Sequence, residues 1–465
     1  MKINIASKET VHFVGIGGIG MSGLAQIMNN MGFVIQGSDL SKNKNIERLN
    51  KMGVKVYFGH HRKNMKKATM VVISSAIKKN NEELIEARKK NLPIFKRGEV
   101  LANIVTLKKN IIIAGSHGKT TTTSLLANIL VESGLDPTVI NGGVINSIKN
   151  NAQLGKGEWA VIESDESDGS FLKRPITYSI VTNLDKEHLD FYGSFDFLKK
   201  SFFKFIEKTP SFGKALICAD DNNLKSIVKN LKTKNFLTYG FAKNSNYQIL
   251  NVRKKLNYSE FDLKLRLIRS QIYTIKNIKV NLIGDHNITN ATGCIAIALN
   301  LGIEINKIKK ALNKFTGIQR RFTKIFSLGK KDFYDDYAHH PTEIKAVLKG
   351  IKEVSKSRKI ICVFQPHRYS RVKSLKKEFA SAFKLCNEVV LCPVYAAGEK
   401  VKFNFNQENF SNIIAHNSKV QVVNIKNQID LKNYIKKNLF HDEIIICMGA
   451  GSISNWIRNI AKEIK

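Results

Sequence analysis

The chain has 465 residues, 43% of them hydrophobic, and no low-complexity tract, so we expect about three globular domains, each with its own core. Its formal charge of +37 would ordinarily suggest a nucleic-acid partner, but the lysines are scattered singly or in pairs and no basic block is interleaved with aromatic residues, so we expect no specific nucleic acid. The six cysteines form no CxxC pair, and the most apolar stretch, 11–28, contains five glycines and several polar side chains; we therefore expect a cytoplasmic protein without membrane insertion.

The first predicted unit is a strand, a glycine turn and a helix between residues 11 and 30. The glycines of a GxGxxG pattern form the turn: Gly15, Gly17 and Gly20. A second strand, 33–38, ends at Asp39, and the whole pattern is the dinucleotide fingerprint, which alone would suggest NAD. The physical requirement, however, is only a diphosphate at a helix N-terminus.

Shorter strands and helices complete this N-terminal domain. We expect strands at 55–59, 70–75 and 94–96 and helices at 45–52 and 81–90. Alternation of strands with helices predicts a small parallel α/β domain that ends near Leu107.

A second strand, glycine loop and helix are predicted around residues 111–126. The loop Gly115, Ser116, His117 and Gly118 lets backbone N–H groups converge on an anion, and Lys119 adds a positive charge. Thr120 and Thr121 lie in the first helical turn, where a hydroxyl can bind Mg²⁺. The common pattern GxxxxGK[ST] would need a glycine in place of Ile113, so we interpret this stretch as a variant nucleotide-phosphate loop. A loop that merely caps a helix is the alternative.

Polar clusters follow two further predicted strands of the central domain, 159–163 and 179–182. The first cluster begins at Glu163, and the second ends at His188. Because ligands bind beyond the carboxyl ends of parallel strands, we expect both clusters to face the phosphate loop and to hold Mg²⁺. Taken separately, each cluster is better explained as a solvated loop or a helix start; their shared position favours the metal site.

The rest of the central domain is predicted to contain antiparallel strands over 247–283 and a helix from Gly284. Asn287 and Asn290 share one face of that helix and suit an adenine edge, although Asn287 could simply cap the helix. Arg321, near the end of this domain, could reach nucleotide phosphates.

The last part of the chain, from about Phe322, is predicted to be a second doubly wound sheet. We expect strands at 333–337, 359–364, 388–393, 420–424 and 443–448. Polar residues again follow the strands, and three of them fall within one turn after 359–364: His367, Arg368 and Arg371. They can converge on a carboxylate or a phosphate; a basic surface turn is the alternative.

These motifs together resemble the Mur ligases of peptidoglycan synthesis, and within that family the members that join L-alanine to UDP-N-acetylmuramate. The resemblance spans nearly the whole chain and rests on eight stretches: GIGGIGMSGLA (15–25), GSHGKTTT (115–122), ESDESDGSF (163–171), TNLDKEHLD (182–190), GDHNITNA (284–291), QRRF (319–322), DDYAHHPTE (335–343) and FQPHRYSR (364–371). It implies an α/β fold of three domains: a Rossmann-like UDP-binding domain (1–107), a central P-loop-like ATPase with a parallel sheet and a small antiparallel sheet (108–321), and a Rossmann-like C-terminal ligase domain (322–465).

The resemblance also implies ATP and Mg²⁺ as cofactors, UDP-N-acetylmuramate and L-alanine as substrates, an acyl-phosphate intermediate, and a monomer or homodimer. The implied UDP-sugar contacts are Gly15, Gly17, Gly18, Gly20, Ser38 and Asp39. The implied ATP contacts are residues 115–121 together with His286, Asn290, Arg321 and Asp336. The implied metal neighbours are Thr120, Glu163 and His188. The implied catalytic residues are Lys119, His188, His339, His367, Arg368 and Arg371.

Several alternatives stay open at this stage. Within the same architecture, the chain could attach a preformed peptide to the same nucleotide sugar, or could extend folate with glutamate, although a folate ligase gives no reason for GIGGIGMSG. An NAD-dependent oxidoreductase would explain only 11–39, and a nucleic-acid-dependent ATPase only the charge and the loop. Several relatives use a carbamylated lysine, which we cannot assign among Lys199, Lys200 and Lys204.

Overall fold

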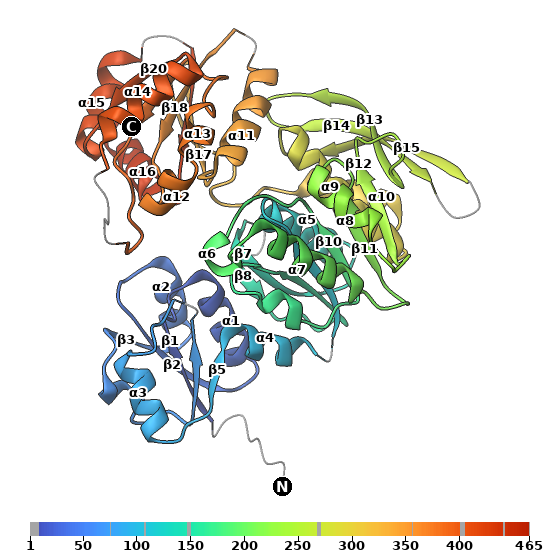
Figure 1. Cartoon of the computed structure of the whole chain (residues 1–465), viewed down its shortest axis with the longest axis vertical. Helices are drawn as coiled ribbons and strands as arrows, with labels where there is room; N and C mark the ends of the chain where they lie inside the picture. Colours follow the sequence, from blue (N-terminus) through green and yellow to red (C-terminus); the bar gives the residue numbers. More distant parts are fainter. Residues whose placement is uncertain are drawn as a thin grey trace. The chain divides into compact units, whose positions relative to one another are not determined.

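The computed structural model describes residues 9–74, 76–106, 108–146, 150–266, 271–355, 357–399, 405–439 and 442–464, which form three sheets flanked by helices (Figure 1). The α/β class predicted from the sequence is confirmed. By compactness the chain divides into two units: Met1–Asn251 with Phe261–Ile278 and Thr289–Thr316, and Val252–Glu260 with Lys279–Ile288 and Gly317–Lys465. Each unit is described by itself below.

The N-terminal sheet has parallel strands in the order β3-β2-β1-β4-β5. They are β1 (Thr10–Val14), β2 (Val34–Asp39), β3 (Lys55–Phe58), β4 (Met70–Ile73) and β5 (Ile94–Lys96). The helices are α1 (Ile19–Asn30), α2 (Lys44–Lys51), α3 (Glu82–Lys89) and α4 (Arg97–Val105), with a 3₁₀ turn η2 (Arg62–Met65). The predicted strands and α1 to α3 are confirmed with small shifts at their ends; the predicted strand end at Ser75 lies outside the described residues.

Helix α4 is absent from the sequence-based prediction for a physical reason. Lys96, its N-cap, has no side chain that accepts a capping hydrogen bond, and Gly98 lies in its first turn. The turn is closed instead by Glu99, whose Oε2 accepts the backbone N–H of Lys96 at 2.9 Å.

The central sheet has the order β15-β14-β13-β12-β11-β10-β6-β9-β7-β8. Its strands are β6 (Lys109–Ala114), β7 (Thr138–Ile145), β8 (Asn150–Gln153), β9 (Trp159–Glu163), β10 (Tyr178–Val181), β11 (Lys214–Cys218), β12 (Phe236–Gly240), β13 (Tyr247–Lys254), β14 (Ser259–Arg266) and β15 (Ile272–Val280). The helical segments are α5 (Lys119–Glu132), η3 (Ser170–Lys173), α6 (Leu189–Tyr192), α7 (Phe195–Glu207), α8 (Asn222–Lys229), α9 (Asp285–Asn300) and α10 (Ile305–Lys314). Strands β6 and β9 to β12 pair in parallel, whereas β8 runs antiparallel to β7.

The antiparallel region predicted from the alternation over 247–283 corresponds to β13, β14 and β15 at one end of this sheet. The turn between β13 and β14 is closed by the backbone N–H of Lys255, which donates to Tyr258 at 2.9 Å, so these neighbours run antiparallel. The short strand β12, which the sequence analysis does not predict, joins this region to the central strands by pairing in parallel with β13.

The C-terminal sheet has the order β16-β17-β21-β18-β19-β20. Its strands are β16 (Thr323–Leu328), β17 (Lys331–Asp336), β18 (Lys359–Phe364), β19 (Glu388–Leu391), β20 (Gln421–Asn424) and β21 (Glu443–Met448). The helices are α11 (Pro341–Val354), α12 (Tyr369–Ser374), α13 (Lys376–Ala380), α14 (Gln407–Ser418), α15 (Gln428–Asn438) and α16 (Ile453–Ile464). Two separate apolar clusters, one with Leu348 and Phe410 and one with Leu431 and Ile457, confirm the predicted doubly wound sheet.

Strand β16 is not predicted because its pairing with the antiparallel strand β17 shifts register between Lys324 and Phe326, which interrupts the alternation of apolar and polar residues. All the other pairs of this sheet are parallel. The polar clusters found in the sequence therefore follow the carboxyl ends of β1, β6, β9, β10, β17 and β18.

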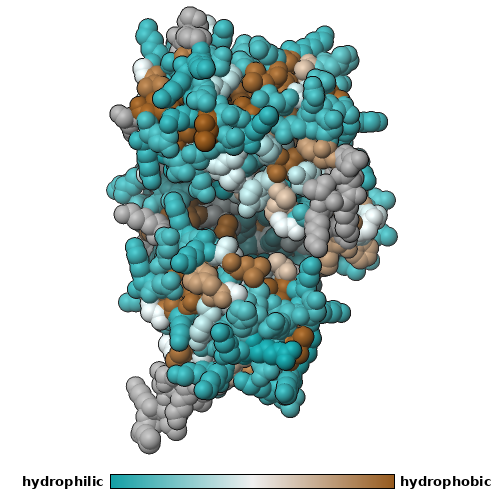
Figure 2. Space-filling view, turned by 90° about the vertical axis from the view of Figure 1, so that its left-hand side faces the viewer, coloured by the Kyte–Doolittle hydropathy of each residue, from teal (hydrophilic) through white to brown (hydrophobic). Residues whose placement is uncertain are grey.

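The face drawn in Figure 2 is mainly hydrophilic, and its hydrophobic residues form small separate groups. This agrees with lysines that are spread along the chain. Among the described residues, no helix combines the length and the apolar character that a membrane crossing requires.

Candidate functional site

The phosphate loop, residues 115–118, joins β6 to α5 and turns at two glycines with positive φ. The φ angles are 134° at Gly115 and 82° at Gly118. A Cβ at Gly115 would collide with Thr182 Oγ1, and one at Gly118 would lie 2.9 Å from Asn290 Oδ1. Side chains are therefore excluded at both positions. Asn183, at the end of β10, fixes the loop, because its Oδ1 accepts the backbone N–H of His117 at 2.8 Å.

Lys119 begins α5 and lies against a buried carboxylate. Its Nζ donates to Glu166 Oε2 at 2.8 Å and to the carbonyl oxygen of Ser116 at 3.1 Å, and Glu166 is fully buried. Burial alone would lower the pKa of Lys119, but the carboxylates of Glu166 and Asp165 raise it above its ordinary value. The ammonium is therefore charged at neutral pH and is available to a phosphate that replaces Glu166.

The predicted metal neighbours separate into two groups. Thr120 donates its hydroxyl to Glu163 Oε1 at 3.1 Å, and Glu163 Oε2 also accepts the backbone N–H of Gly142 at 2.6 Å. His188, by contrast, lies with Asp165 and Glu166, and one donor atom from each of these three residues falls within 4.8 Å of the others. Carboxylate oxygens are the donors that Mg²⁺ prefers, so both groups suit a divalent cation.

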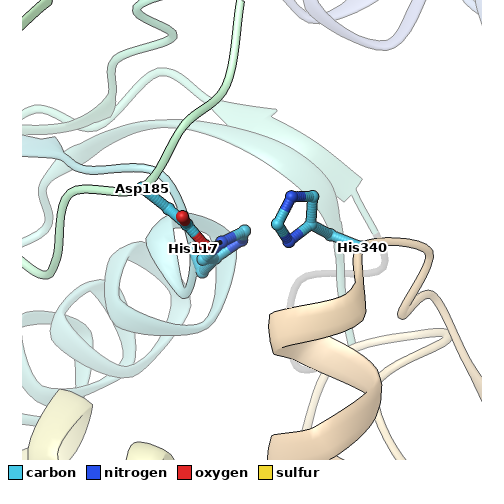
Figure 3. A group of neighbouring side chains, drawn as sticks. All are labelled: His117, Asp185 and His340. Carbon is cyan, nitrogen blue, oxygen red and sulfur yellow. Dashed lines mark hydrogen bonds and ion pairs between the residues drawn. The ribbon is translucent and has the colours of Figure 1, made fainter. Parts of the chain in front are cut away.

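His117 and Asp185 form a second polar contact at the loop. His117 Nε2 lies 3.1 Å from Asp185 Oδ2 (Figure 3), and the backbone N–H of Asp185 donates to Ser116 Oγ at 2.8 Å. The loop after β10 thus holds both Ser116 and His117 in place. His340, which Figure 3 also draws, caps α11, because its Nδ1 accepts the N–H of Thr342 at 3.3 Å.

Two of the implied ATP contacts, His286 and Asn290, lie in the first turns of α9, four positions apart and hence on one face of the helix. Asn290 is buried against Gly118 of the phosphate loop. Burial lowers the pKa of His286 to about 4, so its imidazole is neutral at pH 7.

The N-terminal glycine turn follows β1 and leads into α1. The backbone N–H groups of Gly15 and Ile16 both donate to the carbonyl oxygen of Ser38, at 2.9 and 3.0 Å. The N–H of Gly17 donates to Asp39 Oδ2 at 2.8 Å. Asp39 therefore binds the turn directly.

The side chain of Ser38, an implied UDP-sugar contact, lies in the interior of the domain. Its side chain is fully buried, and its hydroxyl donates to Glu83 Oε2 at 2.5 Å. His60 Nδ1 lies 2.8 Å from the same hydroxyl. The structure thus gives Ser38 the role of shaping the turn through its backbone.

The polar cluster after β18 gathers two arginines and aromatic rings in the second unit. Arg371 Nη1 lies 3.2 Å from His367 Nδ1, and the His367 ring is 5.6 Å from the His339 ring and 5.7 Å from the Tyr395 ring, centroid to centroid. Arg368 has a φ of 70°, which is strained for a residue with a side chain and is fixed by its N–H donating to Tyr395 at 2.9 Å. Among the described residues, no side-chain hydrogen bond or ion pair of Arg368 is present.

The histidines of this cluster are neutral. Burial lowers the pKa of His339 to about 3, and burial together with Arg371 and Arg368 lowers the pKa of His367 to about 4. Positive charge here therefore comes from the two arginines, and the imidazoles remain able to accept a hydrogen bond.

Arg321 and Asp336 also lie in the second unit. Asp336 accepts the backbone N–H groups of Phe322 and Ala338 at 2.7 and 2.8 Å, and burial raises its pKa to about 6. The Arg321 guanidinium lies 5.3 Å from the centroid of the Tyr337 ring.

The sequence analysis missed two residues that shape the site. Glu166 was part of a quoted cluster, but only its contact with Lys119 distinguishes it from Glu163. Asn183, in the second cluster, likewise gains a role only through the loop that it binds.

Three family models match the chain in succession. They are described as Mur ligase family, catalytic domain (residues 10–109), Mur ligase middle domain (113–298) and Mur ligase, glutamate ligase domain (320–451).

Known proteins resemble the chain over its full length. A UDP-N-acetylmuramate–L-alanine ligase of Pelagibacter ubique is 56% identical over 464 residues, covering 100% of both chains. The crystal structure of a UDP-N-acetylmuramate-alanine ligase from Thermotoga maritima matches with a TM-score of 0.83 and 28% identity, covering 98% of this chain and 99% of that one. A murein peptide ligase from Psychrobacter arcticus shares the fold, with a TM-score of 0.71 and 22% identity over 98% of each chain.

Proposed function

Because the chain belongs to the Mur ligase family, we propose that it joins L-alanine to UDP-N-acetylmuramate with hydrolysis of ATP to ADP and phosphate, in the synthesis of peptidoglycan precursors. The observation that carries this proposal is the 56% identity over the whole chain to a ligase of that name. We place the reaction in the cytoplasm and propose a monomer or homodimer. The proposed domain boundaries remain 1–107, 108–321 and 322–465.

In this proposal ATP binds the phosphate loop. Residues 115–121 surround its phosphates with backbone N–H groups and hydroxyls, and Lys119 leaves Glu166 for the terminal phosphates. Asn290, beside the loop, together with His286, meets the adenine. Arg321 and Asp336 are further nucleotide contacts.

Mg²⁺ fits the two carboxylate groups beside the loop. Thr120 with Glu163, and His188 with Asp165 and Glu166, offer hydroxyl, carboxylate and imidazole donors. A bound Mg²⁺ would offset the negative charge of the ATP phosphates. The protein contributes the fixed positions of these donors, which are set by the ends of β9 and β10.

The UDP-sugar binds the N-terminal glycine turn. The turn carries no side chains at its four glycines, so a diphosphate can approach the start of α1. These glycines are Gly15, Gly17, Gly18 and Gly20. Ser38 and Asp39 bind the turn from β2. The turn then serves a uridine nucleotide, and the NAD suggested by the bare fingerprint is not its ligand.

Activation of the muramyl carboxylate comes first, because a carboxylate is a poor acyl donor. One of its oxygens attacks the γ-phosphorus of ATP, the bond to the β-phosphate oxygen breaks, and an acyl phosphate and ADP result. Lys119 and the loop N–H groups stabilise the charge on the transferring phosphoryl group.

L-Alanine then attacks the acyl phosphate. Arg368 and Arg371 hold its carboxylate or the developing oxyanion, the neutral imidazoles of His339 and His367 accept hydrogen bonds from the attacking amine, and the amine's proton leaves with the released phosphate. The acyl carbon becomes tetrahedral, the bond to phosphate breaks, and an amide forms. Orientation of the amine lowers the barrier of this step by about several kcal/mol.

A phosphate-release assay tests the proposal. The enzyme is given ATP, Mg²⁺ and UDP-N-acetylmuramate with single amino acids or with a preformed tripeptide. We expect release with L-alanine and none without the UDP-sugar. Release only with the peptide would assign the chain to peptide attachment, and release without any UDP-sugar would refute the ligase assignment.

A further inference from the structure

The positively charged side chain of Arg97 lies beside the N-terminal glycine turn. It opens α4 directly after β5 and is partly buried. Among the described residues it makes no hydrogen bond and no ion pair. The carboxylate of Asp165 interacts with it only through its charge, since Arg97 lowers the pKa of Asp165 but no ion pair joins the two. An arginine that is partly removed from water without a direct anionic partner is costly unless a ligand supplies one.

The guanidinium of Arg97 packs against Gly20 of the glycine turn. An ideal Cβ built on Gly20 would lie 2.5 Å from Arg97 Nη1 and 3.2 Å from its guanidinium carbon. Gly20 is the last glycine of the GxGxxG pattern and lies in the first turn of α1, where backbone N–H groups have no partner within the helix. The guanidinium therefore occupies the space beside the positive end of α1.

A second guanidinium, that of Arg174, interacts electrostatically with Arg97 and also with the carboxylates of Asp168, Asp165 and Glu163. Arg174 is 3% exposed, and its Nη1 donates to the backbone oxygen of Glu163 at 3.0 Å. Its Nε and Nη2 are buried without a hydrogen-bond partner in the described structure. Burial, and then the charge of Arg97, lower the pKa of Arg174 to about 10, so the two guanidiniums are close enough to repel each other.

We infer that Arg97 binds the diphosphate of the UDP-sugar from the side opposite the glycine turn, with Arg174 supplying further positive potential behind it. The contact with Gly20 favours the diphosphate over the muramyl carboxylate, because that carboxylate has to reach Lys119, which lies instead with Glu166. The inference rests on the proposed function, in which the turn holds a uridine nucleotide.

Calorimetric titration without ATP tests this assignment. The ligands are uridine, UDP and UDP-N-acetylmuramate, and the proteins are the wild type, Arg97→Ala, Arg97→Lys and a matched control, Arg88→Ala, which removes an exposed arginine of α3. We expect Arg97→Ala to lose about tenfold or more in affinity for UDP and for UDP-N-acetylmuramate, with uridine unchanged. Arg97→Lys should retain part of the affinity, since it keeps the charge but not the planar fork.

Two results would overturn the inference. Unchanged UDP affinity with weaker UDP-N-acetylmuramate binding would assign Arg97 to the muramyl carboxylate. An equal loss for uridine would mean that Arg97 only supports the fold of the domain. A wild-type protein that binds neither UDP nor its sugar conjugate would instead refute the proposed function itself, so the two failures are distinguishable.

Discussion

Two loops of the first compact unit, 15–20 and 115–118, share a local design but differ in where their charge comes from. Each connects a buried strand to a helix through glycines. In the first loop the contact is a carboxylate, since Gly17 N–H donates to Asp39 at 2.8 Å. The second loop contains its own cation, Lys119, which lies 2.8 Å from Glu166.

This difference shows that the strand, glycine and helix pattern specifies an anion site without specifying its ligand. The positive charge beside the first loop belongs to Arg97, which is remote in sequence. The charge at the second loop is local, and a carboxylate from another strand end is paired with it. Ligand choice thus depends on tertiary contacts that the motif does not contain.

The largest expected effect is that of Lys119→Ala. If the two loops have separate ligands, turnover should fall by about 10³-fold, because the variant loses a charge that stabilises the transferring phosphoryl group. Affinity for UDP-N-acetylmuramate should stay near that of the wild type. Steady-state assays and calorimetry measure the two quantities, with Lys225→Ala on α8 as the control. A loss of both activity and UDP-sugar affinity would show that the two loops do not bind separate ligands.

The next effect concerns the strand end after β18, which positions its ligands without a glycine turn. Arg371→Lys keeps the charge but removes the planar fork, so we expect the apparent KM for L-alanine to rise by about tenfold to a hundredfold, with a fall in kcat. The KM values for ATP and the UDP-sugar should change little, as should all constants of the control Lys376→Ala. A variant whose single defect is a raised KM for ATP would place Arg371 on the nucleotide.

The smallest effect is a pH dependence of stability at the end of β17. Burial raises the pKa of Asp336 to about 6, above the value of about 3.9 in an unfolded chain. The protonated carboxyl therefore contributes stability that is complete below pH ~3.9 and is lost as the pH rises through ~6, up to about 3 kcal/mol.

Urea unfolding of the wild type and of Asp336→Asn between pH 4 and 7 measures this contribution. The substitution also alters the hydrogen bonds to Phe322 and Ala338, which changes the free energy of unfolding by an amount that does not depend on pH. Beyond that amount, the stability of the variant relative to the wild type should increase as the pH rises. A difference that stays flat over this range would contradict the raised pKa.

Sequence periodicity predicted most of the fold because parallel strands flanked by helices give strong apolar runs, as in β6 and β18. It failed where local signals were weak. Helix α4 begins after Lys96, an N-cap residue whose side chain makes no capping hydrogen bond, and the pairing of β16 contains a register shift. The position of the polar residues at strand ends was predictable, because ligands bind beyond the carboxyl ends of parallel strands.

The contacts within the site could not be predicted in the same way. The sequence places Glu163 and Glu166 in one acidic run, and either could have met Lys119 or Thr120. The structure pairs Glu166 with Lys119 and Glu163 with Thr120. Ser38 and Asp39 are neighbours in sequence, yet the side chain of Ser38 is buried in a network with Glu83. Such choices depend on the direction of side chains, which spacing alone does not determine.

Isotope transfer tests the central claim, ligation through an acyl phosphate, most directly. UDP-N-acetylmuramate labelled with ¹⁸O in its carboxylate is incubated with ATP, Mg²⁺, L-alanine and the enzyme, and the released phosphate and the nucleotide product are examined by mass spectrometry. Attack of the carboxylate on the γ-phosphorus leaves one labelled oxygen in the phosphate, and the product should gain one alanine residue. Unlabelled phosphate released together with the alanine adduct would contradict the acyl-phosphate route.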